Sequence, residues 1–67
     1  MKGKNEFSKK EADEICALIA QKLKADKNGQ KLIRNKIRSI GFYSTDFGMG
    51  PGSGYTANDF LSVVKIM

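Results

Sequence analysis

Hydrophobic residues in the first third of the chain recur at helical spacing. The residues that would share one side of a helix are Ala12, Ile15, Cys16, Ile19 and Leu23. Ser8 and Glu11 stand three positions apart just before this series, an arrangement typical of a capping box at the start of a helix. The pair Asn28-Gly29 offers a glycine for a left-handed helix end. The pattern therefore predicts a first helix over about residues 9–27.

A second apolar series follows after a very short connection. It consists of Leu32, Ile33, Ile37 and Ile40. These residues predict a second helix over about residues 30–40, which Gly41 would end. Because the connection between the two helices is so short, we expect an antiparallel hairpin with the two apolar sides facing each other.

The segment FGMGPGSG, residues 47–54, interrupts this helical pattern. Its four glycines and single proline exclude a regular helix or a central strand, so we expect residues 48–54 to form a flexible loop. After it, Thr56 and Asp59 are spaced as the N-cap and the third residue of a helix. The sequence therefore predicts a short third helix. The tail VVKIM is also rich in β-branched residues, which favour a strand.

Together these elements predict a mostly α fold in a single small domain, residues 1–67. The expected architecture is a helical hairpin followed, after the glycine-rich loop, by a third short helix. We expect residues 1–7 to be a disordered tail. The alternative is an α+β fold in which residues 41–44 and 62–67 pair as a two-stranded ribbon.

Two seven-residue segments of the last third resemble each other. GFYSTDF, residues 41–47, and GYTANDF, residues 54–60, share their glycine, aspartate and phenylalanine positions. Helix capping accounts for the second copy, and a turn in which Asp46 binds the loop backbone accounts for the first. We therefore interpret the similarity as two local structures and not as a repeated binding element.

Composition limits what such a chain can be. Its 67 residues contain one cysteine and no histidine, so an intrachain disulfide and the common zinc sites are excluded. No apolar run approaches the roughly 18 residues of a membrane helix, and the first residues are too charged for a signal peptide. We therefore expect a cytoplasmic protein that does not bind membranes.

The sequence offers little for catalysis or cofactor binding. Cys16 lies on the apolar side of the first predicted helix, where a thiol is a poor nucleophile. Asp46 and Asp59 are accounted for by turn and cap roles. The alternating glycines of residues 48–54 match neither G-x-G-x-x-G nor G-x-x-x-x-G-K-[ST], the two common phosphate-binding patterns. We therefore expect a non-enzymatic protein without metal or cofactor.

The net charge of +5 is concentrated in the middle of the chain. Residues 21–40 hold seven lysines and arginines against one aspartate, which gives this segment +6. Three of these cations, Lys31, Arg34 and Arg38, fall on one side of the second predicted helix, and Lys27 continues the stripe if the turn before that helix keeps its direction. A stripe of this kind suits contact with several phosphates. The sequence therefore suggests a protein that binds the backbone of DNA or RNA.

An alternative function rests on the aromatic residues of the last third. The candidates for contact with a protein partner are Phe42, Tyr43, Phe47, Tyr55 and Phe60. Aromatic side chains are enriched at protein interfaces, and a homodimer would enlarge the core of so small a domain. The competing interpretation is that these residues cover the helical hairpin, whose apolar side would otherwise be half exposed.

Overall fold

The computed structural model describes residues 3–50 and 54–67. Within them, three α-helices and a short 3-10 helix dominate, and the only strands are two of two residues each. In chain order these elements are β1 (Glu6–Phe7), α1 (Lys9–Lys24), α2 (Lys27–Ile40), η1 (Ser44–Phe47), α3 (Ala57–Val63) and β2 (Lys65–Ile66). The prediction of a mostly α fold is confirmed.

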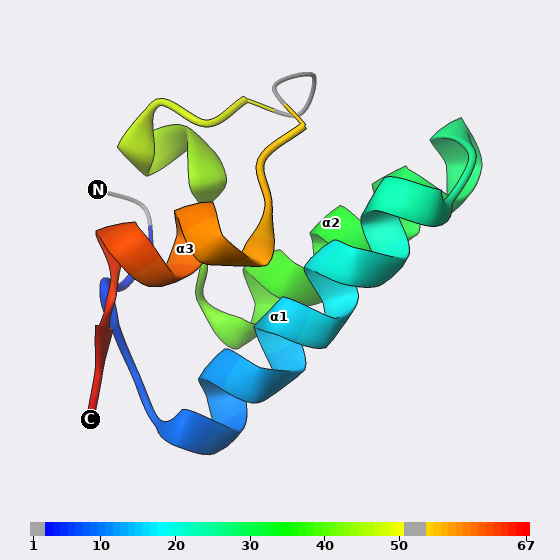
Figure 1. The fold of residues 1–67 in the computed structure, drawn as a ribbon. Helices are drawn as coiled ribbons and strands as arrows, with labels where there is room; N and C mark the ends of the chain where they lie inside the picture. The colour runs from blue at the N-terminus through cyan, green and yellow to red at the C-terminus, as the bar shows by residue number, and fades with distance from the viewer. Residues whose placement is uncertain (1–2, 51–53) are drawn as a thin grey trace.

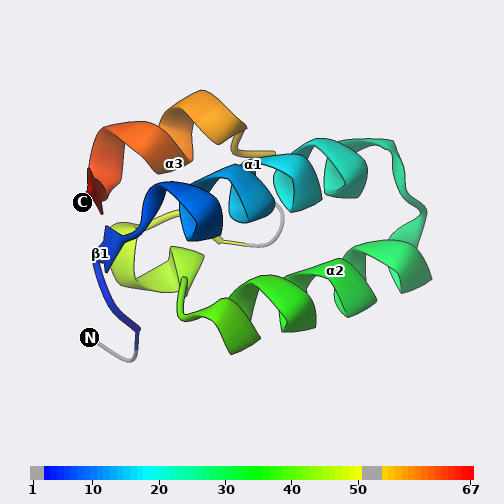
Figure 2. The same cartoon turned by 90° about the horizontal axis from the view of Figure 1, so that it is seen from below.

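Helices α1 and α2 run antiparallel and side by side, while α3 packs against α1 (Figures 1 and 2). The start of α1 follows from its capping box. The Glu11 amide donates to the Ser8 hydroxyl at 3.2 Å, and the Ser8 amide donates to the Glu11 carboxylate at 3.0 Å. Two of the orphan amides at the helix start are thereby satisfied.

The connection between α1 and α2 lies earlier than the sequence suggested. Helix α1 ends at Lys24, and α2 begins at Lys27 because Asp26 accepts a hydrogen bond from the Gly29 amide at 2.8 Å. The prediction that Gly29 ends the first helix is therefore wrong. The aspartate side chain caps the next helix and includes Gly29 in its first turn.

The other helix boundaries match the expected residues. Gly41 ends α2 with a φ of 127°, a backbone conformation that favours glycine. Thr56 caps α3 through a reciprocal capping box with Asp59, and α3 ends at Val63. The tail then becomes extended and forms β2, so the strand-forming character of VVKIM appears after two turns of helix.

The partner of β2 differs from the predicted ribbon. Strand β2 pairs in parallel with β1 and not with residues 41–44. The Lys65 amide donates to the Asn5 carbonyl at 2.8 Å, while the Lys4 amide donates to the Gly41 carbonyl at 3.0 Å. The N-terminal segment therefore lies between the two segments that the sequence suggested would pair.

Two expectations fall partly on residues outside the described part. Residues 1–7 were expected to be a disordered tail, whereas Glu6–Phe7 form a strand and Phe7 is fully buried. Met1 and Lys2 lie outside the described residues. The flexible loop expected over residues 48–54 includes residues 51–53, which also lie outside them.

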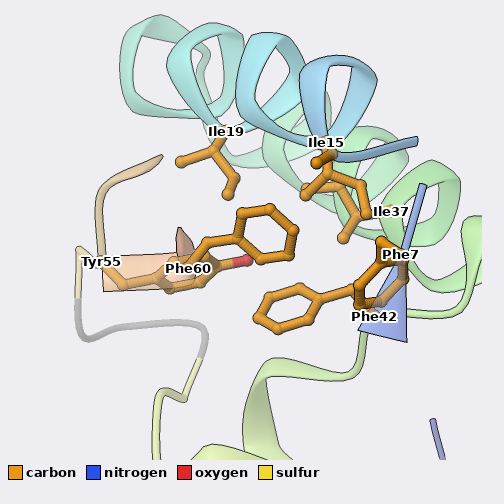
Figure 3. Close-up of a cluster of buried hydrophobic side chains, with 8 residues drawn as sticks. Phe7, Ile15, Ile19, Ile37, Phe42, Tyr55 and Phe60 are labelled. Carbon is orange, nitrogen blue, oxygen red and sulfur yellow. The ribbon is translucent and has the colours of Figure 1, made fainter. Parts of the chain in front are cut away.

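The core is a cluster of aromatic rings under the helical hairpin. Figure 3 shows Ile15 and Ile19 from α1 and Ile37 from α2 pointing at the rings. Phe42 stands at the centre, with its ring centroid 4.6 Å from that of Phe60. The rings of Phe7, Phe47 and Tyr55 lie 5.6–6.2 Å from Phe42. Each aromatic residue comes from a different segment, so the cluster packs together segments that are distant in the sequence.

The two similar segments form different structures. GFYSTDF contains η1, whereas GYTANDF leads into the capped start of α3. Asp59 caps its helix, but Asp46 accepts a hydrogen bond from the Gly3 amide at 2.9 Å. This long-range contact of Asp46 was not anticipated from the sequence.

Candidate nucleic-acid interface

Helix α2 carries a stripe of four cations along its whole length. Because an α-helix turns about 100° per residue, the four residues fall within about 60° of one another. They are Lys27, Lys31, Arg34 and Arg38. We call them the α2 stripe. The early start of α2 at Lys27 places the first of them on the helix itself, so the stripe extends about 16 Å along the axis.

The charges of the α2 stripe face solvent. Lys27, Lys31 and Arg38 are exposed, and Arg34 is half-buried. Within residues 3–50 and 54–67, the one ion pair joins Lys4 to Glu11 at 2.9 Å. In the described part of the chain, no carboxylate therefore neutralises the stripe at contact distance.

A small hollow lies beside the C-terminal half of the stripe. Its lining comes from α2, from η1 and from the two segments that follow α2 and precede α3. The lining residues are Arg34, Ile37, Arg38, Phe42, Ser44 and Tyr55. Its volume of about 10 Å³ is room for roughly one water-sized group. The hollow is therefore too small for an organic substrate, and its lining includes two arginines and two residues with a hydroxyl group.

Tyr55 is the most buried polar group of this hollow. Its residue is only 5% exposed. Burial raises the pKa of the Tyr55 phenol, against weaker lowering effects from a hydrogen bond to Ser44 and from the charges of Arg34 and Arg38. The phenol is therefore neutral at ordinary pH, and its hydroxyl remains a hydrogen-bonding group.

Lys22 adds a fifth cation that the sequence analysis did not place in the site. This residue of α1 is 3% exposed, and its Nζ lies 4.0 Å from the centroid of the Tyr55 ring. The Nζ has no hydrogen-bond partner among the described residues. Burial, and to a lesser degree the charge of Arg34, lowers the pKa of the Lys22 ammonium. Lys22 and Arg34 therefore approach Tyr55 from different helices.

A signal for Lys22 was present in the sequence. The buried residues of α1 are Ala12, Ile15, Ile19 and Lys22, which continue one helical series at spacings of three and four. The apolar pattern instead predicts Leu23 as the next inward residue, and Leu23 is 49% exposed. Lysine is rarely buried without a partner, so this residue type does not itself indicate a core position. On α2, Leu32 was likewise expected to face inward and is 64% exposed.

The aromatic residues considered for protein contact are mostly in the core. Phe42 and Phe60 are fully buried, and Tyr55 is nearly so. Tyr43 and Phe47 are half-buried. The guanidinium carbon of Arg38 lies 5.9 Å from the centroid of the Tyr43 ring, within the range of a cation–π contact. The aromatic cluster therefore covers the hairpin, and Tyr43 also borders the α2 stripe.

The structure gives no support to a catalytic thiol. Cys16 is half-buried. Burial, with a further contribution from the Asp13 carboxylate, raises the pKa of the Cys16 thiol, so its thiolate form is disfavoured. Among the described residues, no group of three or more histidine, cysteine or acidic side chains is arranged to hold a metal ion.

Comparison with protein-family models, curated proteins and solved structures gave no match to this chain. None of the helices in the described part is long and apolar enough to cross a lipid bilayer.

Proposed function

We propose that this chain is a non-enzymatic protein that binds the phosphate backbone of a nucleic acid through the α2 stripe. One observation carries the proposal: four cations lie on one solvent-facing side of a helix, with no carboxylate partner in the described part of the chain. A stripe of about 16 Å matches the length of about five phosphates along one strand.

Backbone contact has a measurable signature because each neutralised phosphate releases counterions. Four phosphate contacts give a slope of log affinity against log salt of about −3.6 for duplex DNA and about −2.8 for a single strand. The chain has only two arginines, Arg34 and Arg38, and arginine is the usual side chain for bidentate contact with guanine. We therefore expect little preference for base sequence.

The test is a fluorescence-anisotropy titration of labelled DNA and RNA, both duplex and single-stranded, at about 50 mM and about 200 mM salt. Affinity should fall about a hundredfold between these salts for duplex DNA. Lys31→Gln should weaken binding to all sequences alike and reduce the slope by about 1. Lys36→Gln is the matched control, because Lys36 is an exposed lysine of α2 that lies about 140° away from Lys31.

The double variant Lys31→Glu with Arg34→Glu is the strongest form of this test. Reversal of two charges should abolish binding at about 200 mM salt if the stripe is the interface. An affinity that does not change with salt, or that survives this double variant, would overturn the proposal. Circular dichroism of each variant should show unchanged helix content.

A second candidate function is self-association. The described residues expose five large hydrophobic side chains: Leu23, Leu32, Leu61, Ile66 and Met67. These residues, and not the buried aromatic cluster, are the apolar groups that a partner would reach. Sedimentation over a range of concentrations tests this function, and a strict monomer at all concentrations argues against it.

A further inference from the structure

Tyr43 is an aromatic residue beside the α2 stripe that the aromatic core does not use. In the described part of the chain, the ring–ring contacts join only members of the core cluster, namely Phe7, Phe42, Phe47, Tyr55 and Phe60. Tyr43 takes part in none of these contacts and is half-buried. It therefore keeps part of its surface in contact with solvent, next to the cations of α2.

The N-terminal segment and η1 hold the Tyr43 ring in place. Tyr43 is the N-cap residue of η1, and its carbonyl accepts a hydrogen bond from the Asp46 amide at 3.0 Å. The backbone of Gly3 lies against the ring, since a Cβ added at Gly3 would be 2.7 Å from Cδ1 of Tyr43. The Gly3 amide is in turn bound by the Asp46 carboxylate at 2.9 Å. A ring supported in this way loses little conformational freedom when a ligand stacks on it.

Arg38, the last residue of the α2 stripe, lies beside the same ring. Its guanidinium carbon is 5.9 Å from the centroid of the Tyr43 ring, near the outer limit of a cation–π contact. Atoms in direct stacking contact are about 3.5–4.0 Å apart, so the guanidinium borders the ring without closing it off. A phosphate bound by Arg38 would therefore bring the attached nucleotide within reach of Tyr43.

We propose that the ligand of the α2 stripe is a single strand of nucleic acid, with Tyr43 stacking on an unpaired base next to the phosphate that Arg38 binds. The identity of the ligand as a nucleic acid rests on the proposed function. In a duplex the faces of the bases are covered by their neighbours, whereas a single strand can place a base on an aromatic side chain. Because every base has a face that can stack, this contact adds no strong preference for base sequence.

The experiment compares three ligands of equal length by fluorescence anisotropy at one salt concentration, each prepared in DNA and in RNA. They are a single strand, a strand with abasic sites in place of all its nucleotides, and a duplex. The abasic strand keeps the phosphates and lacks the bases, so it can bind through the α2 stripe alone. In DNA or in RNA, the single strand should bind at least about fivefold more tightly than the abasic strand.

Substitutions of Tyr43 test whether this residue makes the stacking contact. Tyr43→Leu should abolish the advantage of the single strand and leave the affinities for the abasic strand and the duplex unchanged. Tyr43→Phe should retain the advantage, because stacking does not need the hydroxyl group. Phe47→Leu is the matched control and should also retain it, since Phe47 is half-buried but stacks on Phe42 in the core. Lys31→Gln should weaken the single strand and the abasic strand by the same factor.

The variant Tyr43→Trp reports on stacking directly, because the natural chain contains no tryptophan. The fluorescence of the introduced indole should be quenched by the single strand and not by the abasic strand. A purely structural role of Tyr43 would not produce this difference between the two ligands. Circular dichroism of each variant should show unchanged helix content.

The outcomes separate the stacking contact from the proposed function. Equal, salt-dependent affinity for the single strand and the abasic strand would overturn the stacking contact and leave backbone binding intact. No binding to any of the three ligands would overturn both proposals. Binding of the duplex alone would overturn the single strand as the ligand. A folded Tyr43→Leu protein that keeps the advantage of the single strand would overturn the assignment of the contact to Tyr43.

Discussion

At the scale of single residues, Lys22 is where sequence and structure differ most. It occupies a core position of α1 that the helical series fills elsewhere with Ala12, Ile15 and Ile19. Its ammonium contacts the Tyr55 ring and has no hydrogen-bond partner among the described residues. A charged side chain is unfavourable at a buried position, so substitution of Lys22 should change the stability of the fold measurably.

Replacement of this ammonium by a thioether should stabilise the protein. Lys22→Met keeps an unbranched side chain of similar length, and it removes the desolvation penalty and the repulsion from Arg34. The loss of the cation–π contact opposes this gain. We expect the free energy of unfolding, measured by urea denaturation, to rise by about 1 kcal/mol.

Lys24→Met, at an exposed position of α1, is the control and should change the free energy of unfolding by less than about 0.5 kcal/mol. A less stable Lys22→Met protein would contradict this account.

The pH dependence of the stability difference between Lys22→Met and the natural protein gives a second test. The pKa of Lys22 is lowered in the folded state from its ordinary value of 10.5. Between the folded pKa and 10.5 the unfolded chain binds more protons, so stability rises with pH. The advantage of Lys22→Met over the natural protein should therefore shrink as pH approaches 10.5. The raised pKa of Tyr55 acts in the opposite direction above pH 10.0, but Tyr55 is common to both proteins. An advantage that stays constant up to pH 10.5 would argue against a charged, buried Lys22.

At the scale of elements, local capping patterns predicted the helix starts well. Ser8 with Glu11 and Thr56 with Asp59 cap α1 and α3 as expected, because these contacts span only three residues. The boundary at Asp26 was missed since two local signals compete there, and the aspartate cap outweighed the left-handed glycine end. The same shift placed Lys27 on the helix and completed the α2 stripe.

The variant Asp26→Ala distinguishes the observed boundary between α1 and α2 from the boundary predicted from the sequence, because the two predict opposite changes in stability. In the structure Asp26 is the N-cap of α2, so its removal should lower the free energy of unfolding by about 1 kcal/mol. In a first helix that extends to residue 27, Asp26 would lie in the last turn, where a carboxylate opposes the helix dipole and its removal would stabilise. Thermal denaturation measures the sign. Asp13→Ala, an exposed aspartate of α1, provides the matched loss of charge.

At the scale of the whole molecule, the fold depends on contacts between distant parts of the chain. Strand β1 pairs with β2 across nearly the full length of the sequence. Two residues in length, β1 leaves no periodicity from which its partner could be predicted. The hollow is likewise a product of tertiary packing, because Arg34, Ser44 and Tyr55 come from separate segments. Three residues of the stripe were predictable from the helical spacing of α2, and Lys27 joined them through the cap at Asp26, whereas the hollow and the burial of Lys22 required the packed hairpin.

Phe7 tests whether the N-terminal segment is part of this core. Its ring is fully buried and lies 5.7 Å from Phe60 and 6.2 Å from Phe42. Phe7→Ala should therefore lower the free energy of unfolding by about 3–5 kcal/mol. A domain of this size has a total stability of roughly 3–10 kcal/mol at about 0.05–0.15 kcal/mol per residue. We expect a large fraction of the protein to be unfolded at room temperature. The helical circular dichroism signal and the chemical-shift dispersion of the tyrosine NMR signals should then be lost.

The control is Glu6→Ala, at the exposed neighbour of Phe7 in β1, which should change the free energy of unfolding by less than about 0.5 kcal/mol. Equal effects of the two variants would mean that residues 1–7 behave as a tail, and that the cluster around Phe42 is sufficient to hold the three helices together.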